Sequence, residues 1–140
     1  MKGIIAIVVV ALAGCTSVKV RPLAAEAAVK HVCIQDNPKV TVPDFVTIVR
    51  DGFDRHGLST EIVTGTPPKN CETLLTYTAL RSWDVVTYLS HAELRLERGG
   101  RQIGYAEYHL KGGGGFALNK WASTKSKMDP VIDQLLGDYR

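Results

Sequence analysis

The fold class is decided by Val85-Val86-Thr87-Tyr88-Leu89-Ser90-His91-Ala92-Glu93-Leu94-Arg95-Leu96-Glu97, in which apolar and polar side chains fall on two different faces. One face carries Val86, Tyr88, Ala92, Leu94 and Leu96, and the other carries Thr87, His91, Glu93, Arg95 and Glu97. A period of two residues is typical of a β-strand with one face on a core and the other in water. The stretch therefore predicts an antiparallel sheet that is covered on one side.

The segment that follows predicts a hairpin partner for this strand. Gly99-Gly100 suits a tight turn, because glycine adopts positive φ without a steric penalty, and residues 102–111 return as the next strand. Two registers remain open at this point. A two-residue loop aligns Leu94 with Tyr105, whereas a three-residue loop aligns Leu94 with Ala106, and the difference exchanges the two faces of the returning strand.

Two helices are expected. The first spans residues 43–56, because Pro43 suits a first helical turn, the apolar residues recur on one face and Gly57 suits a left-handed cap. The second carries Val131, Ile132, Leu135 and Leu136, after Ser126, Asp129 and Pro130 mark its start, and ends at Gly137.

Three more strands complete the expected order, at residues 31–34, 58–64 and 73–83. The order of strand, helix, four strands and helix predicts an α+β two-layer sandwich. It has a mostly antiparallel five-stranded sheet with both helices on one face. The strands at 31–34 and 58–64, joined by the first helix, should be parallel with a right-handed crossover.

The N-terminal segment resembles a bacterial lipoprotein signal. Lys2 supplies a positive charge, residues 3–12 lack charge, and Leu12-Ala13-Gly14-Cys15 resembles the lipobox that precedes a lipidated cysteine. The resemblance implies a signal peptide at 1–14, acylation of Cys15 and a lipid anchor. Thr16 replaces the aspartate of an inner-membrane retention signal, which favours the outer membrane. Residues 15–30 are expected to form a tether and residues 31–140 a single periplasmic domain.

Two further cysteines, Cys33 and Cys71, form an even pair in what would be an oxidising compartment, so a disulfide is expected. A metal site is the open alternative, built on His31, Cys33 and Cys71 together with one of His56, His91 or His109. A redox-active dithiol is not expected, because the chain has no C-x-x-C motif.

Other candidate positions give no catalytic motif. The glycines at 112–115 are followed by Phe116 rather than by Gly-Lys-Ser/Thr, so they predict a connection or a partner-contacting loop instead of a phosphate loop. Trp121 suits either an interface or the edge of the core. In the three-residue register, the polar face would gather His91, Glu93, Glu107 and His109, which could hold a metal or form an acid-base site. No cofactor is expected.

Several segments together resemble a family of small proteobacterial lipoproteins that have no established activity. They are Val32-Cys33-Ile34-Gln35-Asp36-Asn37-Pro38, Val42-Pro43-Asp44-Phe45, Tyr77-Thr78-Ala79, Trp83-Asp84 and the late glycine tract. The resemblance covers about residues 30–140. It implies a periplasm-facing lipoprotein with a disulfide between the matching cysteines and carries over no catalytic residue.

The sequence thus favours a non-enzymatic module, held on membrane lipid through acylated Cys15, that binds an envelope protein or glycan. His91 on the polar sheet face and Phe116 and Trp121 in the 112–121 loop are the expected contacts. One alternative is a metal-dependent or hydrolytic envelope enzyme that uses His91, Glu93 and His109. Another is a surface-exposed structural lipoprotein. Nucleic acid is not an expected partner, because the net charge is only +3 and shows no basic stripe.

Overall fold

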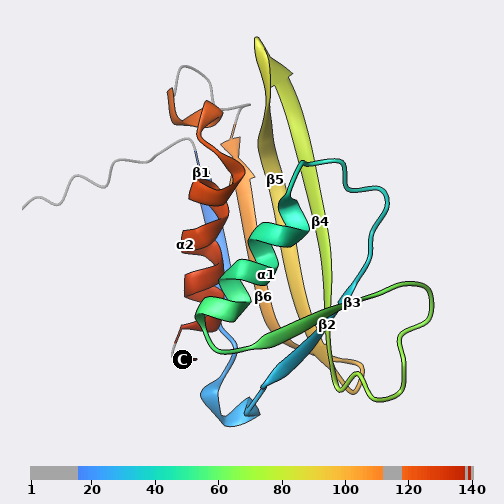
Figure 1. The fold of residues 1–140 in the computed structure, drawn as a ribbon. Helices are drawn as coiled ribbons and strands as arrows, with labels where there is room; N and C mark the ends of the chain where they lie inside the picture. Colours follow the sequence, from blue (N-terminus) through green and yellow to red (C-terminus); the bar gives the residue numbers. More distant parts are fainter. Residues whose placement is uncertain (1–15, 112–117, 138, 140) are drawn as a thin grey trace, which may run out of the picture.

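The computed structural model describes residues 16–111, 118–137 and 139. A six-stranded sheet is covered on one face by two helices, which gives a two-layer α+β fold (Figure 1). The strands are β1 (Thr16–Arg21), β2 (His31–Gln35), β3 (Ser59–Val63), β4 (Thr73–Asp84), β5 (Val86–Arg98) and β6 (Arg101–Leu110). The helices are α1 (Phe45–Arg55) and α2 (Thr124–Leu136), with short 3-10 turns η1 (Ala25–Ala27) and η3 (Leu118–Trp121).

The sheet order is β1-β6-β5-β4-β2-β3. Strand β2 pairs in parallel with both β3 and β4, and every other pairing is antiparallel. The parallel β2–β3 pair connected by α1 is confirmed. The expected five-stranded, mostly antiparallel sheet is corrected to a six-stranded mixed sheet.

Strand β1 is the element that the sequence interpretation missed. All six of its residues pair with β6, and Leu23 beyond it is buried and donates its N–H to the Leu135 carbonyl at 2.8 Å. Residues 16–29 are therefore not a tether but part of the folded domain. The signal was weak because β1 is a short strand at the sheet edge, and only Val18 and Val20 alternate with charged residues.

The β5–β6 hairpin combines both of the registers that the sequence left open. Gly99 and Gly100 have φ values of 57° and 75° and form a two-residue turn that pairs Arg98 with Arg101. The register then shifts at a bulge, where Ile103 is the extra residue, and Leu94 pairs with Ala106. Most of the hairpin therefore has the three-residue register, in which His91 faces His109 and Glu93 faces Glu107.

The β4–β5 hairpin extends beyond the rest of the sheet (Figure 1). It turns at Val85, which lies between the paired residues Asp84 and Val86 and has a φ of 67°. A second bulge, at Ser90, changes the register below the tip. Val86, which the alternation placed on the core face, is exposed, because the tip runs past the helical layer.

The helices begin and end close to the expected residues, with one correction. Helix α2 begins earlier than expected: Ser123 caps it by accepting a hydrogen bond from the Ser126 N–H at 3.1 Å, and Pro130 lies inside the helix. The proline removes one backbone hydrogen bond, which this packed helix tolerates. Its buried apolar side chains are Met128, Val131, Ile132, Leu135 and Leu136.

Candidate functional site

The end of the molecule beyond the helical layer exposes four large apolar side chains. Trp83, Val85, Val86 and Trp121 are 73%, 76%, 53% and 40% exposed. We refer to these four residues as the apolar hairpin end. Scattered single apolar residues are normal on a protein surface, but four at one end of the molecule, two of them tryptophan, make this end a candidate interaction surface.

Polar contacts of Asp84 and Lys120 hold the apolar hairpin end together. The Trp121 Nε1–H donates to the Asp84 carbonyl at 2.9 Å, and Lys120 Nζ donates to the Asp84 carboxylate at 2.5 Å. Lys120 is buried and also lies 4.5 Å from the Trp121 ring centroid. Asp84 therefore ties the hairpin to η3.

A second lysine supports this arrangement from below. Lys127 Nζ donates to the Leu89 carbonyl at 3.1 Å and to the Lys120 carbonyl, and it lies over the ring of Tyr88. Burial lowers the pKa of Lys127. Because these contacts join α2, β5 and η3, they fix the orientation of the hairpin relative to the helices.

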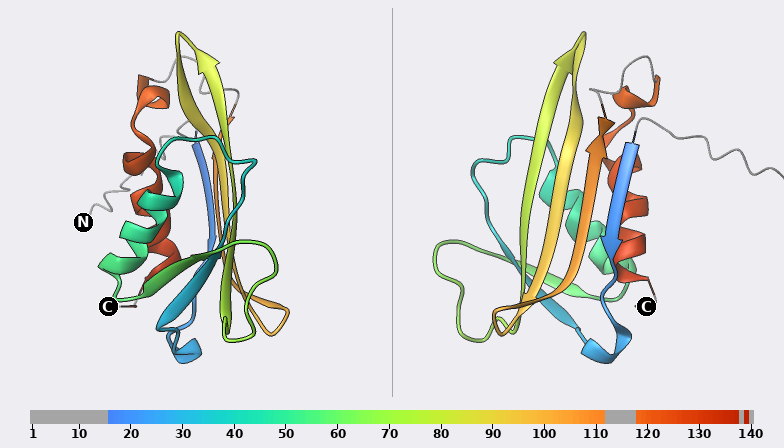
Figure 2. Two further views of the ribbon diagram at one scale, coloured as in Figure 1. Left: turned by 45° about the vertical axis from the view of Figure 1, so that its right-hand side comes forward. Right: turned by 180° about the vertical axis from the view of Figure 1, so that it is seen from behind.

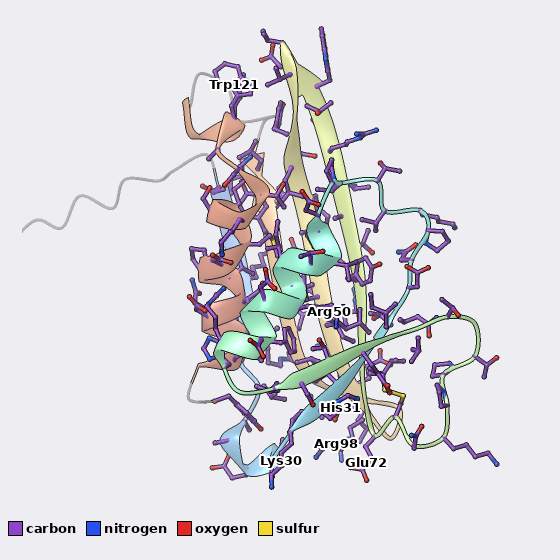
Figure 3. The ribbon with its side chains drawn as sticks, in the orientation of Figure 1. Lys30, His31, Arg50, Glu72, Arg98 and Trp121 are labelled. Carbon is purple, nitrogen blue, oxygen red and sulfur yellow. A yellow bond between two sulfur atoms is a disulfide. The ribbon has the colours of Figure 1, made fainter. Side chains whose placement is uncertain are left out.

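The opposite end of the molecule is charged. Figure 3 shows Trp121 at one end and Lys30, His31, Glu72 and Arg98 at the other. The Arg98 guanidinium donates to the Ala27 carbonyl at 2.6 Å, which joins β5 to η1. The fold thus separates an apolar, aromatic end from a charged end.

The polar face of the sheet brings together the four residues that the three-residue register predicted. His91 Nδ1 lies 3.2 Å from His109 Nδ1, and the rings meet edge to face with centroids 5.3 Å apart. The other ring nitrogen of His91, Nε2, lies 3.3 Å from the Glu93 carboxylate. Arg95 donates to the same carboxylate at 3.2 Å.

Glu107 is held on this face by Tyr105, whose hydroxyl donates to its carboxylate at 2.7 Å. This hydrogen bond lowers the pKa of Glu107, and the nearby positive charge of Lys19 lowers it further. Burial and the neighbouring Glu107 carboxylate raise the pKa of Tyr105 to about 12. At neutral pH the face therefore presents a carboxylate and a neutral phenol.

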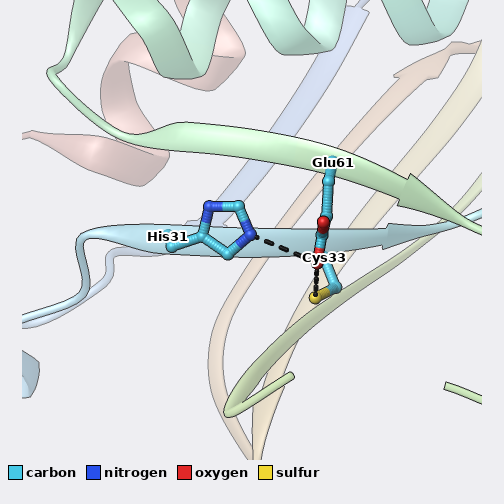
Figure 4. A group of neighbouring side chains, drawn as sticks. All are labelled: His31, Cys33 and Glu61. Carbon is cyan, nitrogen blue, oxygen red and sulfur yellow. Dashed lines mark hydrogen bonds and ion pairs between the residues drawn. The ribbon is translucent and has the colours of Figure 1, made fainter. Parts of the chain in front are cut away.

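The expected disulfide is confirmed, with the Cα atoms of Cys33 and Cys71 5.8 Å apart. Beside it, His31 Nε2 lies 3.4 Å from a Glu61 oxygen that also lies 3.2 Å from Cys33 Sγ (Figure 4). Both sulfur atoms are committed to the disulfide, so neither is a thiolate ligand, and the alternative metal site on His31, Cys33 and Cys71 is wrong for this structure. Glu61 was not expected near these residues.

The predicted contact residues belong to different surfaces. His91 lies on the polar sheet face, whereas Trp121 lies at the apolar hairpin end and lines a hollow of about 460 Å³ with Pro43 and Tyr88. Cys15, Phe116 and the glycines at 112–115 lie outside the described residues. Trp83 was not expected as a contact. The sequence did carry a sign of this surface: Trp83, Val85 and Val86 are large apolar residues at a hairpin turn that contains no glycine, asparagine or proline.

Comparison with known proteins identifies solved structures with a similar fold but does not assign the chain to a family. No family model and no curated protein matches the chain. A point variant of PelC from Paraburkholderia phytofirmans, described as a dodecamer, has a TM-score of 0.60 at 16% identity. The alignment covers 86% of this chain and 96% of that one. Another crystal form of the PelC dodecamer has the same TM-score at 13% identity, with 86% and 98% coverage.

A minor lipoprotein from Acinetobacter baumannii matches more distantly, with a TM-score of 0.32 at 14% identity over 77% of this chain and 87% of that one. That score is too low to support an argument. The two PelC structures show that the fold itself occurs in a solved protein. No helix in the described parts of the chain is long and apolar enough to cross a membrane.

Proposed function

We propose that this protein is a lipid-anchored, non-enzymatic module of the bacterial outer membrane, acylated on Cys15 and seated on the membrane by its apolar hairpin end. One observation carries the proposal. Strand β1 begins at Thr16, the residue that follows Cys15, and it begins at the same end of the sheet as the hairpin tip (Figure 2). The start of β1 and the hairpin tip with its exposed apolar side chains therefore lie at the same end of the sheet.

The strand pairing gives the distance by which the hairpin tip extends beyond the first residues of β1. Ser17 pairs with His109, His109 with His91, and His91 with Leu80, so these residues form one row across the sheet. Strand β4 continues for four residues beyond this row, from Arg81 to Asp84. At roughly 3.3 Å per residue, the tip stands about 13 Å past the row that holds Ser17.

The chemistry of the tip suits the membrane interface. Tryptophan is favoured where one part of the ring meets lipid and the N–H meets water, and valine side chains favour the acyl region. Interfacial elements bury their apolar faces by about 5–10 Å, a depth that the projecting tip can reach from an anchor near the headgroups. The charged end with Lys30, Glu72 and Arg98 would then face the periplasm, where another envelope protein or glycan would bind.

PelC, which shares this fold, is a dodecamer, and this suggests how copies of the present module are arranged. Strands β1 and β3 are the two edges of the sheet, and exposed edges are ready sites for pairing between chains. We extend the proposal to a homo-oligomer formed through these edges. Light scattering of the acylated protein in detergent tests it, since a monomer at micromolar concentration would remove this part of the proposal.

The anchor is tested with Cys15→Ser in cells. The wild-type protein is expected in the outer-membrane fraction with an acylated N-terminal cysteine in its mass spectrum, and the variant is expected to leave that fraction. An unacylated wild-type protein, or unchanged fractionation of the variant, contradicts the anchor. Protease treatment of intact cells separates the periplasm-facing module from a surface-exposed structural lipoprotein, which would be cleaved.

The seating of the hairpin is tested by fluorescence. Acylated Trp121→Phe protein, in which Trp83 is the remaining tryptophan, is reconstituted into vesicles of phosphatidylethanolamine and phosphatidylglycerol. We expect a blue-shifted emission that is quenched by lipids brominated near the headgroup. A matched control carries Glu72→Trp with both native tryptophans replaced by phenylalanine, and its emission should remain that of a water-exposed indole. Equal quenching of both proteins, or of neither, contradicts the proposed orientation.

A further inference from the structure

We infer that His91 and His109 form a two-histidine chelate for a divalent transition-metal ion on the polar face of the sheet. The two side chains come from neighbouring strands, β5 and β6, and are brought opposite each other by the bulge at Ile103. Imidazole nitrogen is a preferred ligand of Zn²⁺, Cu²⁺ and Ni²⁺. The inference is independent of the membrane seating proposed above.

The separation of the two nitrogens fits a shared ion. Metal–nitrogen bonds of about 2.0–2.1 Å at a tetrahedral angle place two ligand nitrogens about 3.3 Å apart. The observed distance between His91 Nδ1 and His109 Nδ1 is 3.2 Å. The same nitrogen of each ring points toward the other ring, so little movement is needed for both to bind one ion.

The surroundings of His91 match those of a metal-bound histidine. Such a histidine usually donates its second N–H to a carboxylate, which fixes its tautomer and makes the ligand nitrogen more basic. His91 has this partner in Glu93, 3.3 Å from Nε2, and Arg95 holds the Glu93 carboxylate in place. A histidine that only fills a solvated strand position does not need such an oriented pair.

Space and charge for the ion are present next to the pair. His91, His109 and Glu107 line a hollow of about 550 Å³ that also includes Ser82 and Ser90. Glu107 lines the same hollow, and its carboxylate adds negative charge beside a cation. Two protein nitrogens leave the other coordination positions to water, so the ion would remain accessible to a small anionic or carbonyl ligand.

The competing cluster on the same molecule lacks these properties. This cluster consists of His31, Cys33 and Glu61. Among the described residues, these are the side chains of ligand type that lie together in a group of three, with donor atoms within 4.8 Å of one another. Cys33 is bonded to Cys71, which leaves one imidazole and one exposed carboxylate. His31 therefore serves as the matched control for the His91–His109 pair.

The test uses the full-length protein, purified without a polyhistidine tag, stripped with chelator and dialysed. Calorimetric titration with Cu²⁺ and with Zn²⁺ should each give one site, with Cu²⁺ bound more tightly, as the Irving–Williams order requires. His91→Gln and His109→Gln should weaken binding by more than tenfold, Glu93→Gln by about tenfold, and His31→Gln not at all. Far-UV circular dichroism confirms that each variant is folded.

Electron paramagnetic resonance of the wild-type protein with one equivalent of Cu²⁺ gives a second readout that needs no variant. Coupling to two imidazole nitrogens is expected. The inference is overturned by the absence of a saturable site, by binding that depends on His31 instead, or by a copper spectrum with fewer than two imidazole ligands. In that case the 3.2 Å contact is a hydrogen bond between the two rings.

Discussion

Gly52 of α1 packs against Ile132 of α2, and its replacement by alanine gives a prediction with a definite sign. A Cβ at this position would lie 2.8 Å from Cγ2 and 2.9 Å from Cδ1 of Ile132. Both distances are shorter than real carbon–carbon contacts. Ile132 is fully buried in the core, where close packing limits how far its side chain can move.

Two opposing terms set the magnitude. Overpacking a core by one methyl group costs about 1–3 kcal/mol, whereas replacing glycine with alanine inside a helix gains about 1 kcal/mol. We therefore expect Gly52→Ala to lower the free energy of unfolding by about 1 kcal/mol. In an Ile132→Ala background both close atoms are gone and only Cβ remains, 3.3 Å away. There the same substitution should raise the free energy of unfolding by about 1 kcal/mol.

The assay is a double-mutant cycle of urea unfolding, followed by circular dichroism, on the wild type, the two single variants and the double variant. The expected coupling energy is about 2 kcal/mol, with similar m-values for all four proteins. A stabilising Gly52→Ala in the wild type, or effects that add to within about 0.5 kcal/mol, would show that the helices are not held at this distance.

Three further predictions concern stability. Replacing Cys33 and Cys71 by alanine should lower the free energy of unfolding by about 4 kcal/mol, because the bond closes a loop with a sequence separation of 38; thermal unfolding that differs by less than about 1 kcal/mol contradicts this. Burial alone would raise the pKa of Asp133, but hydrogen bonds from His56 and a neighbouring arginine lower it below 3.8. The carboxylate therefore stabilises the fold above that pH and loses this contribution as the pH falls through its folded pKa. Asp133→Asn should cost up to about 1 kcal/mol at pH 6, and urea titrations should show the difference vanishing as the pH falls through the folded pKa of Asp133. A difference that stays constant with pH refutes the linkage. Val85→Asn should raise the free energy of unfolding by about 1 kcal/mol, because asparagine tolerates positive φ and the valine side chain is mostly exposed. The same substitution should weaken binding to vesicles. A loss of stability would show that the turn is not strained.

The sequence predicted those elements that are marked by a local pattern of residues within the element itself. The alternation that ends at Glu97 identified β5, and Gly99-Gly100 identified the turn that follows it. Gly57, with a φ of 75°, terminates α1 as its position suggested. The bulge at Ile103 could not be predicted, because an extra residue in one strand is decided by packing on the neighbouring strands.

Strand β1 shows a different limit. Its threonine and two valines favour a strand, but six residues are too few to identify one, and the segment pairs because β6 offers a free edge along its whole length. The missing information was the position of another strand, about 90 residues later in the chain. The candidate metal chelate depends on the same kind of information: the residue types of His91 and His109 were visible, but their contact depended on a register that only the folded sheet defines.

The revised role of β1 changes what a lipid on Cys15 would do. A flexible tether would let the domain rotate freely, and the composition of its surface near the anchor would then matter little. Because Thr16 is already paired with Leu110, almost no flexible chain would separate a lipid on Cys15 from the folded sheet. The end of the sheet at which β1 begins would then be held close to the membrane. The residues at that end are the ones that a freely dissolved domain would be expected to avoid. They include a tryptophan that is 73% exposed and a valine held at positive φ, which costs about 1–2 kcal/mol. Two unfavourable features at one turn are difficult to explain by the stability of the domain alone, and both are explained if the turn is selected for contact with lipid.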